Sequence, residues 1–289
     1  MKMGFIGVGL MGQGMSTCLL KAGHELAVVA HSNRKPIDYL VRQGAVEIPT
    51  IRALATDCEV LFLCLPSADT VASVIQQMEP VLQVGQLIID TSTSLPERSV
   101  GWARQLRDQG VGFVDAPVTG GPEGAAAGAL ASMVGGYEPD YLRAAPLIDC
   151  YSKQVVYFGE SGAGNRAKLI HNFITTGQVA LIVEAVRLCD QAGLDRSKLY
   201  SVLSQGGAAS KTLEKLLPSA LEGRYDGHRF SLEHASKDVA YIHQMMGQLH
   251  SDSQMIEGIT HFFQRALMQY PKETFLSGLL KTDEKPTGK

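Results

Sequence analysis

The sequence has few of the features that mark specialised classes of protein. Its five cysteines, at positions 18, 58, 64, 150 and 189, form no CxxC pair, which favours reduced thiols in a cytoplasmic protein over a disulfide framework. Its eight histidines form no HxxxH or HExxH pattern, so no metal site is expected. A net charge of -3 gives no reason to expect nucleic acid or a membrane surface as a partner.

Long apolar runs are also missing. No stretch reaches the ~20 apolar residues that a transmembrane helix requires, so no membrane span is expected. The N-terminus enters a strand-like segment almost at once, without the basic region and cleavable apolar segment of a signal peptide. No internal repeat and no low-complexity block interrupts the chain.

The composition is that of a globular chain, with 45% hydrophobic and 19% charged residues. Its 289 residues suffice for one large domain or two ordinary ones. Strand-like and helix-like segments alternate only in the first part of the chain, so we expect an α/β fold. Residues 1–161 would form a Rossmann-type doubly wound sheet, and residues 162–289 an all-helical domain. The helical domain would begin with a long helix that ends near Gly193. Further helices are expected at residues 197–204, 212–221, 232–249 and 253–269.

Three glycines near the N-terminus, Gly7, Gly9 and Gly12, form a G-x-G-x-x-G motif between a strand-like and a helix-like run. The first permits a tight turn, the second lets the backbone approach a pyrophosphate, and the third lets the helix pack closely on the sheet. The helix start at Leu10 and Met11 would present unpaired N–H groups and a positive dipole end to the phosphates. The motif indicates dinucleotide binding; the alternative is a glycine-rich turn without a ligand.

The turn after the second predicted strand indicates which nicotinamide cofactor is bound. An acidic residue there would hold the ribose 2′-hydroxyl of NAD and repel a 2′-phosphate. The chain instead has His-Ser-Asn-Arg-Lys from position 31, and no carboxylate appears before Asp38. Ser32 and Asn33 can hydrogen-bond a phosphate and Arg34 supplies charge, so the sequence favours NADP over NAD. A solvated basic turn is the alternative.

Two more turns follow predicted strands. The hydroxyl-rich segment 91–94 follows the strand-like residues 87–90, and a glycine-rich segment from Thr119 follows residues 111–117. Ligands gather at the carboxyl ends of strands in an open parallel sheet, so the hydroxyl-rich turn suits polar ligand groups, although a helix cap explains it equally. Successive glycine N–H groups can bind an anion, here a carboxylate; the alternative is a flexible loop.

The change of pattern near residue 162 coincides with a lysine and an amide that would share one helix face. Lys168 and Asn172 are four residues apart, which is one helical turn. This pair is a candidate active site, whereas spacing alone favours a solvated lysine at a helix start. Further along the chain, the simplest interpretation of Lys237 and Asp238 is an exposed charged pair.

Together these motifs resemble the β-hydroxyacid dehydrogenases, the family that contains 3-hydroxyisobutyrate dehydrogenase and tartronate semialdehyde reductase. The resemblance covers nearly the whole chain. It rests on five segments in the family's order: residues 5–12, 90–96, 115–125, 162–172 and 237–238. Five motifs in order are more specific than any one of them, so the resemblance favours the functional interpretation of each.

The resemblance implies a role for each matching position. Lys168 would be the catalytic general acid/base, and Asn172 would hold the substrate beside it. The implied substrate ligands are Ser92, Thr119, Gly120, Gly121 and Asn172. The implied cofactor ligands are Gly7, Gly9, Leu10, Met11, Gly12, Ser32, Asn33, Arg34, Leu65, Pro66, Thr93 and Lys237, the last oriented by Asp238.

Three positions depart from the family pattern. Thr119 stands where serine is usual, which adds a methyl group to the pocket. His171 stands where many members have asparagine, so substrate contacts there differ. The turn after the second strand is one residue longer than the common Asn-Arg-Thr pattern, and Ser32, Asn33 and Arg34 all remain candidates for contact with the 2′-phosphate.

The implied reaction is reversible hydride transfer between a nicotinamide and C3 of a short 3-hydroxy acid. Lys168 would take the hydroxyl proton in oxidation, and partial burial beside the cation Lys237 would lower its pKa from roughly 10.4 toward the ~7–8 of a catalytic lysine. Reduction of tartronic or succinic semialdehyde on the same scaffold is the alternative.

Two other functions fit the sequence less well. Imine reductases, a related group, generally lack the lysine kept here at position 168, and non-catalytic NADP-binding relatives lose it too. The partner expected is therefore a small carboxylate substrate. The extensive apolar surface of the long helix also predicts a homodimer or homotetramer.

Overall fold

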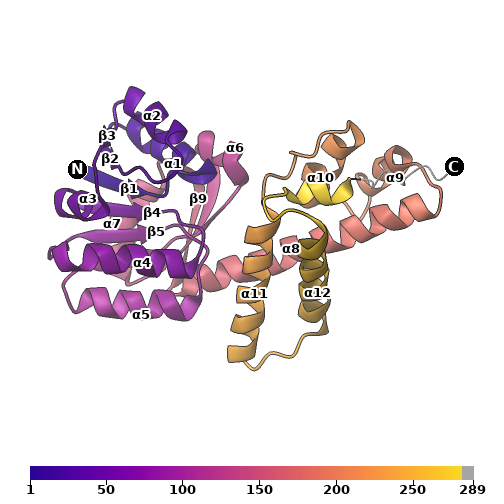
Figure 1. The fold of residues 1–289 in the computed structure, drawn as a ribbon. Helices are drawn as coiled ribbons and strands as arrows, with labels where there is room; N and C mark the ends of the chain where they lie inside the picture. Colours follow the sequence, from indigo (N-terminus) through magenta and orange to yellow (C-terminus); the bar gives the residue numbers. More distant parts are fainter. Residues whose placement is uncertain (282–289) are drawn as a thin grey trace. The chain divides into compact units, whose positions relative to one another are not determined.

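The computed structural model describes residues 1–281 and divides the chain into two compact units. The first comprises Met1–Leu169 and the second begins at Ile170. The first unit is a doubly wound α/β domain and the second is helical, so the predicted fold class is confirmed (Figure 1).

A nine-stranded sheet forms the centre of the first unit. Its strands are β1 (Lys2–Ile6), β2 (Glu25–Val28), β3 (Val46–Glu47), β4 (Val60–Leu63), β5 (Leu87–Asp90), β6 (Gly112–Asp115), β7 (Val118–Thr119), β8 (Leu130–Gly136) and β9 (Ser152–Gly159). The order is β3-β2-β1-β4-β5-β6-β8-β7, with β9 paired to β8. The strands from β3 to β6 are parallel, and the winding reverses between β1 and β4, where such sheets bind ligands.

Helices cover both faces of this sheet. They are α1 (Leu10–Lys21), α2 (Lys35–Arg42), α3 (Ile51–Asp57), α4 (Ala68–Met78), α5 (Pro96–Arg107), α6 (Gly121–Ala126) and α7 (Glu138–Ile148), with a 3-10 turn at Glu79–Val81. The strands β4 and β5 are buried throughout, as expected for parallel strands with helices on both faces. Under α1, α2 and α7, the rings of Phe5 and Phe62 stack with centroids 5.7 Å apart, and Tyr151 meets Phe62 edge-on.

The second unit contains most of the long helix α8 (Ala163–Gln191) and four shorter helices. These are α9 (Arg196–Leu203), α10 (Lys211–Leu221), α11 (Leu232–Gln248) and α12 (Gln254–Gln269), followed by a 3-10 turn at Leu276–Leu280. Each shorter helix lies within one residue of its predicted bounds at both ends. Side-chain caps fix the starts of α9, α10 and α11, where Asp195, Ser210 and Ser231 each accept a backbone N–H from the first turn. Figure 1 shows α11 and α12 as an antiparallel pair.

The division between the units falls inside α8, after Leu169. The helix itself is continuous from Ala163 to Gln191. The first seven residues of α8 therefore belong to the α/β unit, whereas the rest belongs to the helical unit. The predicted division between residues 161 and 162 stays a proposal about domain organisation.

Within residues 1–281, one helix is long and apolar enough to cross a membrane by length and composition. This is α8, with a mean hydropathy of 1.4 over 18 residues. No such segment was expected, because the sequence has no run of the ~20 apolar residues that a membrane span requires. A single helix of this kind is weak evidence for a membrane span, since interior helices of globular domains meet the same criterion.

Candidate active site

The glycine turn between β1 and α1 has the conformation that its sequence motif predicts. Gly7 has a φ of +99°, and a Cβ there would lie 2.2 Å from the carbonyl oxygen of Cys64. A Cβ on Gly12 would lie 2.2 Å from the carbonyl oxygen of Gly7. Gly9 differs, because no protein atom lies within 4 Å of the position its Cβ would occupy. Protein packing therefore requires two of the glycines, whereas the third leaves open space at the helix start.

The start of α1 fits the pyrophosphate of a dinucleotide. Gly9 is the N-cap and supplies no side-chain acceptor, and the first turn contains no acidic residue. The first backbone N–H groups of a helix have no intrahelical acceptor and attract anions. Leu10 is about half exposed at this turn, and Met11 packs partly against the core below.

The basic turn after β2 is exposed and internally bonded. Asn33 accepts the Lys35 N–H through its side-chain oxygen, and the Ser32 hydroxyl lies 3.2 Å from His31 Nδ1. Arg34 donates two hydrogen bonds to Glu47 and one to Asp38. All three predicted phosphate ligands thus lie together at the carboxyl end of β2.

The hydroxyl-rich turn after β5 forms hydrogen bonds at the ends of the neighbouring strands β4 and β5. The Ser92 hydroxyl accepts the Leu65 N–H at 2.9 Å, and the Ser92 N–H is donated to the Asp90 carboxylate. Ser92 is buried, and its hydroxyl therefore fixes the position of the Leu65–Pro66 loop that follows β4. Thr93, the residue after Ser92, is half-buried.

The glycine-rich segment after β6 lies against α1 through the short helix α6. Gly120 and Gly121 have φ angles of +135° and +79°, a conformation that residues with a Cβ rarely adopt. Thr119 ends β7 and is half-buried. A Cβ on Gly14 of α1 would lie 2.7 Å from the backbone of Ala125, so the two helices pack backbone to backbone. The expected carboxylate loop and the expected phosphate helix are thereby joined.

The first turn of α8 is held by a buried carboxylate. Asp115, at the end of β6, accepts the Gly162 N–H at 2.7 Å and the Asn165 N–H at 2.8 Å. Burial, reinforced by the neighbouring Asp90, raises the pKa of Asp115 to about 7, although the two N–H donors oppose the shift. Gly164 completes the contact, because a Cβ there would lie 2.4 Å from the Asp115 carbonyl oxygen.

Asn165 ties the same helical turn to the hydroxyl-rich turn. Its side-chain oxygen accepts the Ser94 N–H at 2.8 Å, and its amide nitrogen donates to the Ser99 hydroxyl. Lys168 follows three residues later and is only 8% exposed. The predicted catalytic lysine therefore lies on a helix that two buried side chains attach to the ends of β5 and β6.

A second group of the predicted residues lies together in the helical unit. The Asn172 amide donates to Asp238 at 2.6 Å, and its oxygen lies 2.9 Å from His171 Nδ1. The Lys237 ammonium lies 3.0 Å from the other oxygen of Asp238 and 5.0 Å from the centroid of the Tyr241 ring. Because the carboxylate can only accept, it fixes the orientation of the Asn172 amide, and His171 must then donate through Nδ1.

Sequence reasoning missed several residues that position these groups. Asn165 has no motif role of its own, and its partners are more than 60 residues away in the chain. Asp115 opens a recognised motif, but no local pattern reveals that its carboxylate caps α8. The 66-residue separation of Asn172 and Asp238 likewise hides their contact.

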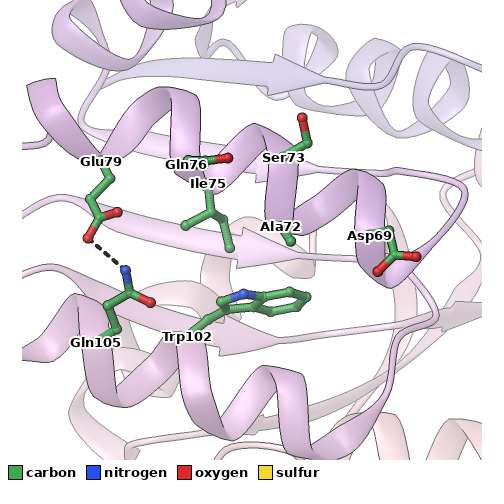
Figure 2. Close-up of a pocket in the computed structure, with 8 residues that line it drawn as sticks. All are labelled: Asp69, Ala72, Ser73, Ile75, Gln76, Glu79, Trp102 and Gln105. Carbon is green, nitrogen blue, oxygen red and sulfur yellow. Dashed lines mark hydrogen bonds between the residues drawn. The ribbon is translucent and has the colours of Figure 1, made fainter.

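A surface groove between α4 and α5 is separate from these residues. Figure 2 shows its floor at Trp102 and its polar rim, where Gln105 donates to Glu79 at 2.7 Å. Its volume is about 480 Å³. None of the predicted site residues lines it.

Comparison with known proteins identifies relatives of both parts of the chain. Residues 2–159 match the family model of the NAD binding domain of 6-phosphogluconate dehydrogenase, and residues 162–282 match the model described as NAD-binding of NADP-dependent 3-hydroxyisobutyrate dehydrogenase. The 2-hydroxy-3-oxopropionate reductase of Escherichia coli (strain K12) is 33% identical over 74% of each chain.

Solved structures show the same fold over nearly the whole chain. A 3-hydroxyisobutyrate dehydrogenase of Salmonella typhimurium superposes with a TM-score of 0.89 at 23% identity, covering 96% of this chain and 98% of that one. A protein named Psf3, solved in complex with NADP+ and 2-OPP, has a TM-score of 0.87 at 28% identity and the same coverage.

The fold and the turn at α1 thus define an NAD(P)-dependent oxidoreductase. More narrowly, the chain belongs to the β-hydroxyacid dehydrogenase family, as the two family models and the relatives together demonstrate.

Proposed function

We propose that this enzyme transfers hydride reversibly between NADP and C3 of a short 3-hydroxy acid, with Lys168 as the general acid/base. The observation that carries the proposal is the placement of Lys168. It is buried on α8, one helical turn beyond the Asp115 and Asn165 contacts that hold this helix to the strand ends. This buried position differs from the solvated lysine that the spacing of Lys168 and Asn172 alone favoured.

The bound nicotinamide would supply the hydride chemistry, and the residues of the chain would position the substrate and move a proton. In oxidation, Lys168 Nζ takes the proton of the substrate hydroxyl; in reduction, it returns that proton to the carbonyl oxygen. Its burial excludes bulk water from around the amine. Proton transfer by a positioned side chain typically contributes ~10²–10⁴-fold to the rate.

Substrate binding is assigned to two groups of residues. Thr119, Gly120 and Gly121 hold the carboxylate of the substrate through the hydroxyl and the backbone N–H groups of the turn. Asn172, one turn beyond Lys168 on α8, orients the reacting hydroxyl, and Asp238 fixes its amide. Ser92 acts by positioning the Leu65–Pro66 loop, since its hydroxyl accepts the Leu65 N–H.

NADP is the proposed cofactor, rather than NAD. The turn after β2 offers Ser32, Asn33 and Arg34 and contains no carboxylate between residues 29 and 37. A positive and hydrogen-bonding turn at this place recognises a 2′-phosphate, whereas an acidic one recognises the 2′-hydroxyl of NAD. Psf3, a neighbour of similar fold, was solved with NADP+, which supports the assignment.

Reduction of a semialdehyde is the second candidate. The relatives include the 2-hydroxy-3-oxopropionate reductase of Escherichia coli and a glyoxylate/succinic semialdehyde reductase of Arabidopsis thaliana, which is 31% identical over 82% of this chain. Both reactions use the same proton donor and hydride source. The side chains at Thr119 and His171 are where the two substrate classes would be distinguished.

A homodimer or homotetramer in the cytoplasm completes the proposal. Within the helical unit, α8 exposes Ile170, Ile174, Leu181 and Leu188, each more than half accessible and spaced by four or seven residues. Spacings of four and seven align side chains along one face of a helix. Such an apolar face is typical of a contact between subunits.

Steady-state kinetics with purified enzyme test the proposal. Small 3-hydroxy acids and the corresponding semialdehydes would be screened with NADP(H) and NAD(H), and light scattering would give the subunit number. We expect the highest kcat/KM for a short substrate that carries a carboxylate, with NADP(H) as the cofactor. Turnover of neither substrate class with either cofactor would contradict the proposed function.

A further inference from the structure

Arg34 is held by two carboxylates at the edge of the cofactor turn. Its Nη1 and Nη2 donate to the two oxygens of Glu47 at 2.9 Å each, and Nη2 also donates to Asp38 at 3.1 Å. Glu47 ends β3, which pairs in parallel with β2 and sets Glu47 opposite Val28. The carboxylate thus stands at the carboxyl end of the sheet, next to the strand after which the ribose is bound.

The pairing is bidentate and shifts the pKa values of both groups. The hydrogen bonds from Arg34 lower the pKa of Glu47, and those to Glu47 and Asp38 raise the pKa of Arg34 above its usual range. Glu47 therefore stays ionised through the physiological pH range. Both side chains are on the surface, where water and ions screen the pair and exchange of partners is easy.

A 2′-phosphate would compete with Glu47 for the same donors. A guanidinium in a fork-to-fork pair with a carboxylate uses the two parallel N–H bonds that it would also use for a phosphate. Glu47 would moreover bring a negative charge close to the dianionic phosphate. Both effects weaken NADP(H) binding, and neither acts on NAD(H), which lacks the phosphate.

We propose that Glu47 is a specificity-determining residue that restrains the preference for NADP(H) by competing for Arg34. The inference rests on the proposed use of the β2 turn as the 2′-phosphate site. In NAD-binding domains, an acidic residue at the end of the second strand repels the 2′-phosphate of NADP. Glu47 would have this effect here from the neighbouring strand. Asp38 contributes in the same direction through its single contact.

The test is the substitution Glu47→Gln, which removes the charge and keeps the shape. The expected result is a Kd for NADPH lower by about 3- to 10-fold, as for one charge removed near a dianion at the protein surface, with less than a twofold change for NADH. The readout is cofactor fluorescence titration at low and high salt, and the gain should shrink at high salt. Asp38→Asn should give a smaller change of the same sign.

Glu25→Gln is the matched control. Glu25 is an exposed glutamate at the opposite end of β2, and the substitution changes the net charge equally. It should leave both Kd values unchanged. An unchanged or weaker NADPH affinity in Glu47→Gln would overturn the inference, because Glu47 would then be inert or would preorganise Arg34 for the phosphate.

The two proposals fail in distinguishable ways. If the wild-type enzyme binds NADH more tightly, the NADP assignment is wrong, yet the change in the NADPH/NADH ratio on Glu47→Gln still decides the role of Glu47. If the wild-type enzyme prefers NADPH and the ratio does not move, only the inference about Glu47 fails.

Discussion

The two units position their candidate site residues by different physical means. In the first unit, close backbone packing does much of the work: Gly7, Gly12 and Gly164 each stand where a Cβ would lie less than 2.5 Å from another backbone atom. In the second unit, a chain of side-chain contacts through Asn172 and Asp238 does the same task. A backbone constraint demands one residue type, whereas a side-chain network tolerates replacements that keep its hydrogen bonds.

The largest effect is expected from Gly164→Ala. Its Cβ would lie 2.4 Å from the Asp115 oxygen and 2.5 Å from the Met133 oxygen, and backbone atoms cannot move aside cheaply. We expect a loss of about 3 kcal/mol or more in the free energy of unfolding, measured by urea denaturation.

Gly9→Ala is the matched control for that substitution. No atom lies within 4 Å of its Cβ position, and its φ of -93° is accessible to alanine. The free energy of unfolding should change by less than about 0.5 kcal/mol, while the Kd for NADPH rises at least about 10-fold because the Cβ meets the pyrophosphate. If Gly9→Ala bound NADPH normally, the open space at Gly9 would have no role in binding.

The next effect tests the side-chain network of the helical unit. Asp238→Ala removes the acceptor of the Asn172 amide and the anion beside the ammonium of Lys237. The side chain of Lys237 is itself largely buried. The expected loss is about 2–3 kcal/mol in the free energy of unfolding. Asp238→Asn keeps an acceptor and should lose about 1 kcal/mol. Equal losses in the two variants would show that the charge, and not the hydrogen bond, stabilises the network.

Asp115 gives the first unit a characteristic dependence on pH. Its pKa is raised to about 7 in the folded chain, so between about pH 4 and 7 the native state holds a proton that the unfolded state has released. Its contribution to stability therefore falls as pH rises through this window. Asp115→Asn should remove that slope, at a loss of about 1–2 kcal/mol for one weakened cap. Urea denaturation across this pH range, in parallel for both proteins, measures it.

His228 gives the helical unit the opposite dependence. Burial, with a smaller effect of Lys215, lowers the pKa of His228 to about 4. Below about pH 6.5 the unfolded state takes up a proton that the native state refuses, so stability falls as pH falls from 6.5 to 4. His228→Phe should remove this acid sensitivity, which amounts to about 2 kcal/mol at pH 5, as measured by thermal denaturation. A slope of the same sign as that of Asp115 would contradict the contrast.

The same contrast explains what the sequence could predict. The sequence predicts the turn at Gly7, Gly9 and Gly12 because the spacing of these glycines reflects local backbone geometry. It predicts the helix bounds of the second unit because capping and apolar periodicity are also local. The short strands β3 and β7 have only two residues each and leave no periodic pattern. Asn165 and the pairing of Asn172 with Asp238 depend on contacts across more than 60 residues, which no local pattern contains.

Arg34 shows the same limit at the cofactor turn. The sequence shows a basic turn as a local pattern, and its binding of a 2′-phosphate stays a prediction. It does not reveal that Glu47, thirteen residues later, lies against that arginine, because this follows from the pairing of β3 with β2.

The most direct test of the proposed mechanism is the turnover of Lys168 variants, measured together with cofactor affinity. Lys168→Ala should lower kcat by about 10³-fold, within the range of general acid/base catalysis, with a Kd for NADPH within twofold of the wild type. Lys168→Arg should be equally inactive, because a guanidinium keeps its charge but does not release its proton. Lys153→Ala, an exposed lysine of β9, serves as the control with normal turnover. Wild-type kcat in Lys168→Ala would contradict the assignment of the proton transfer to this residue.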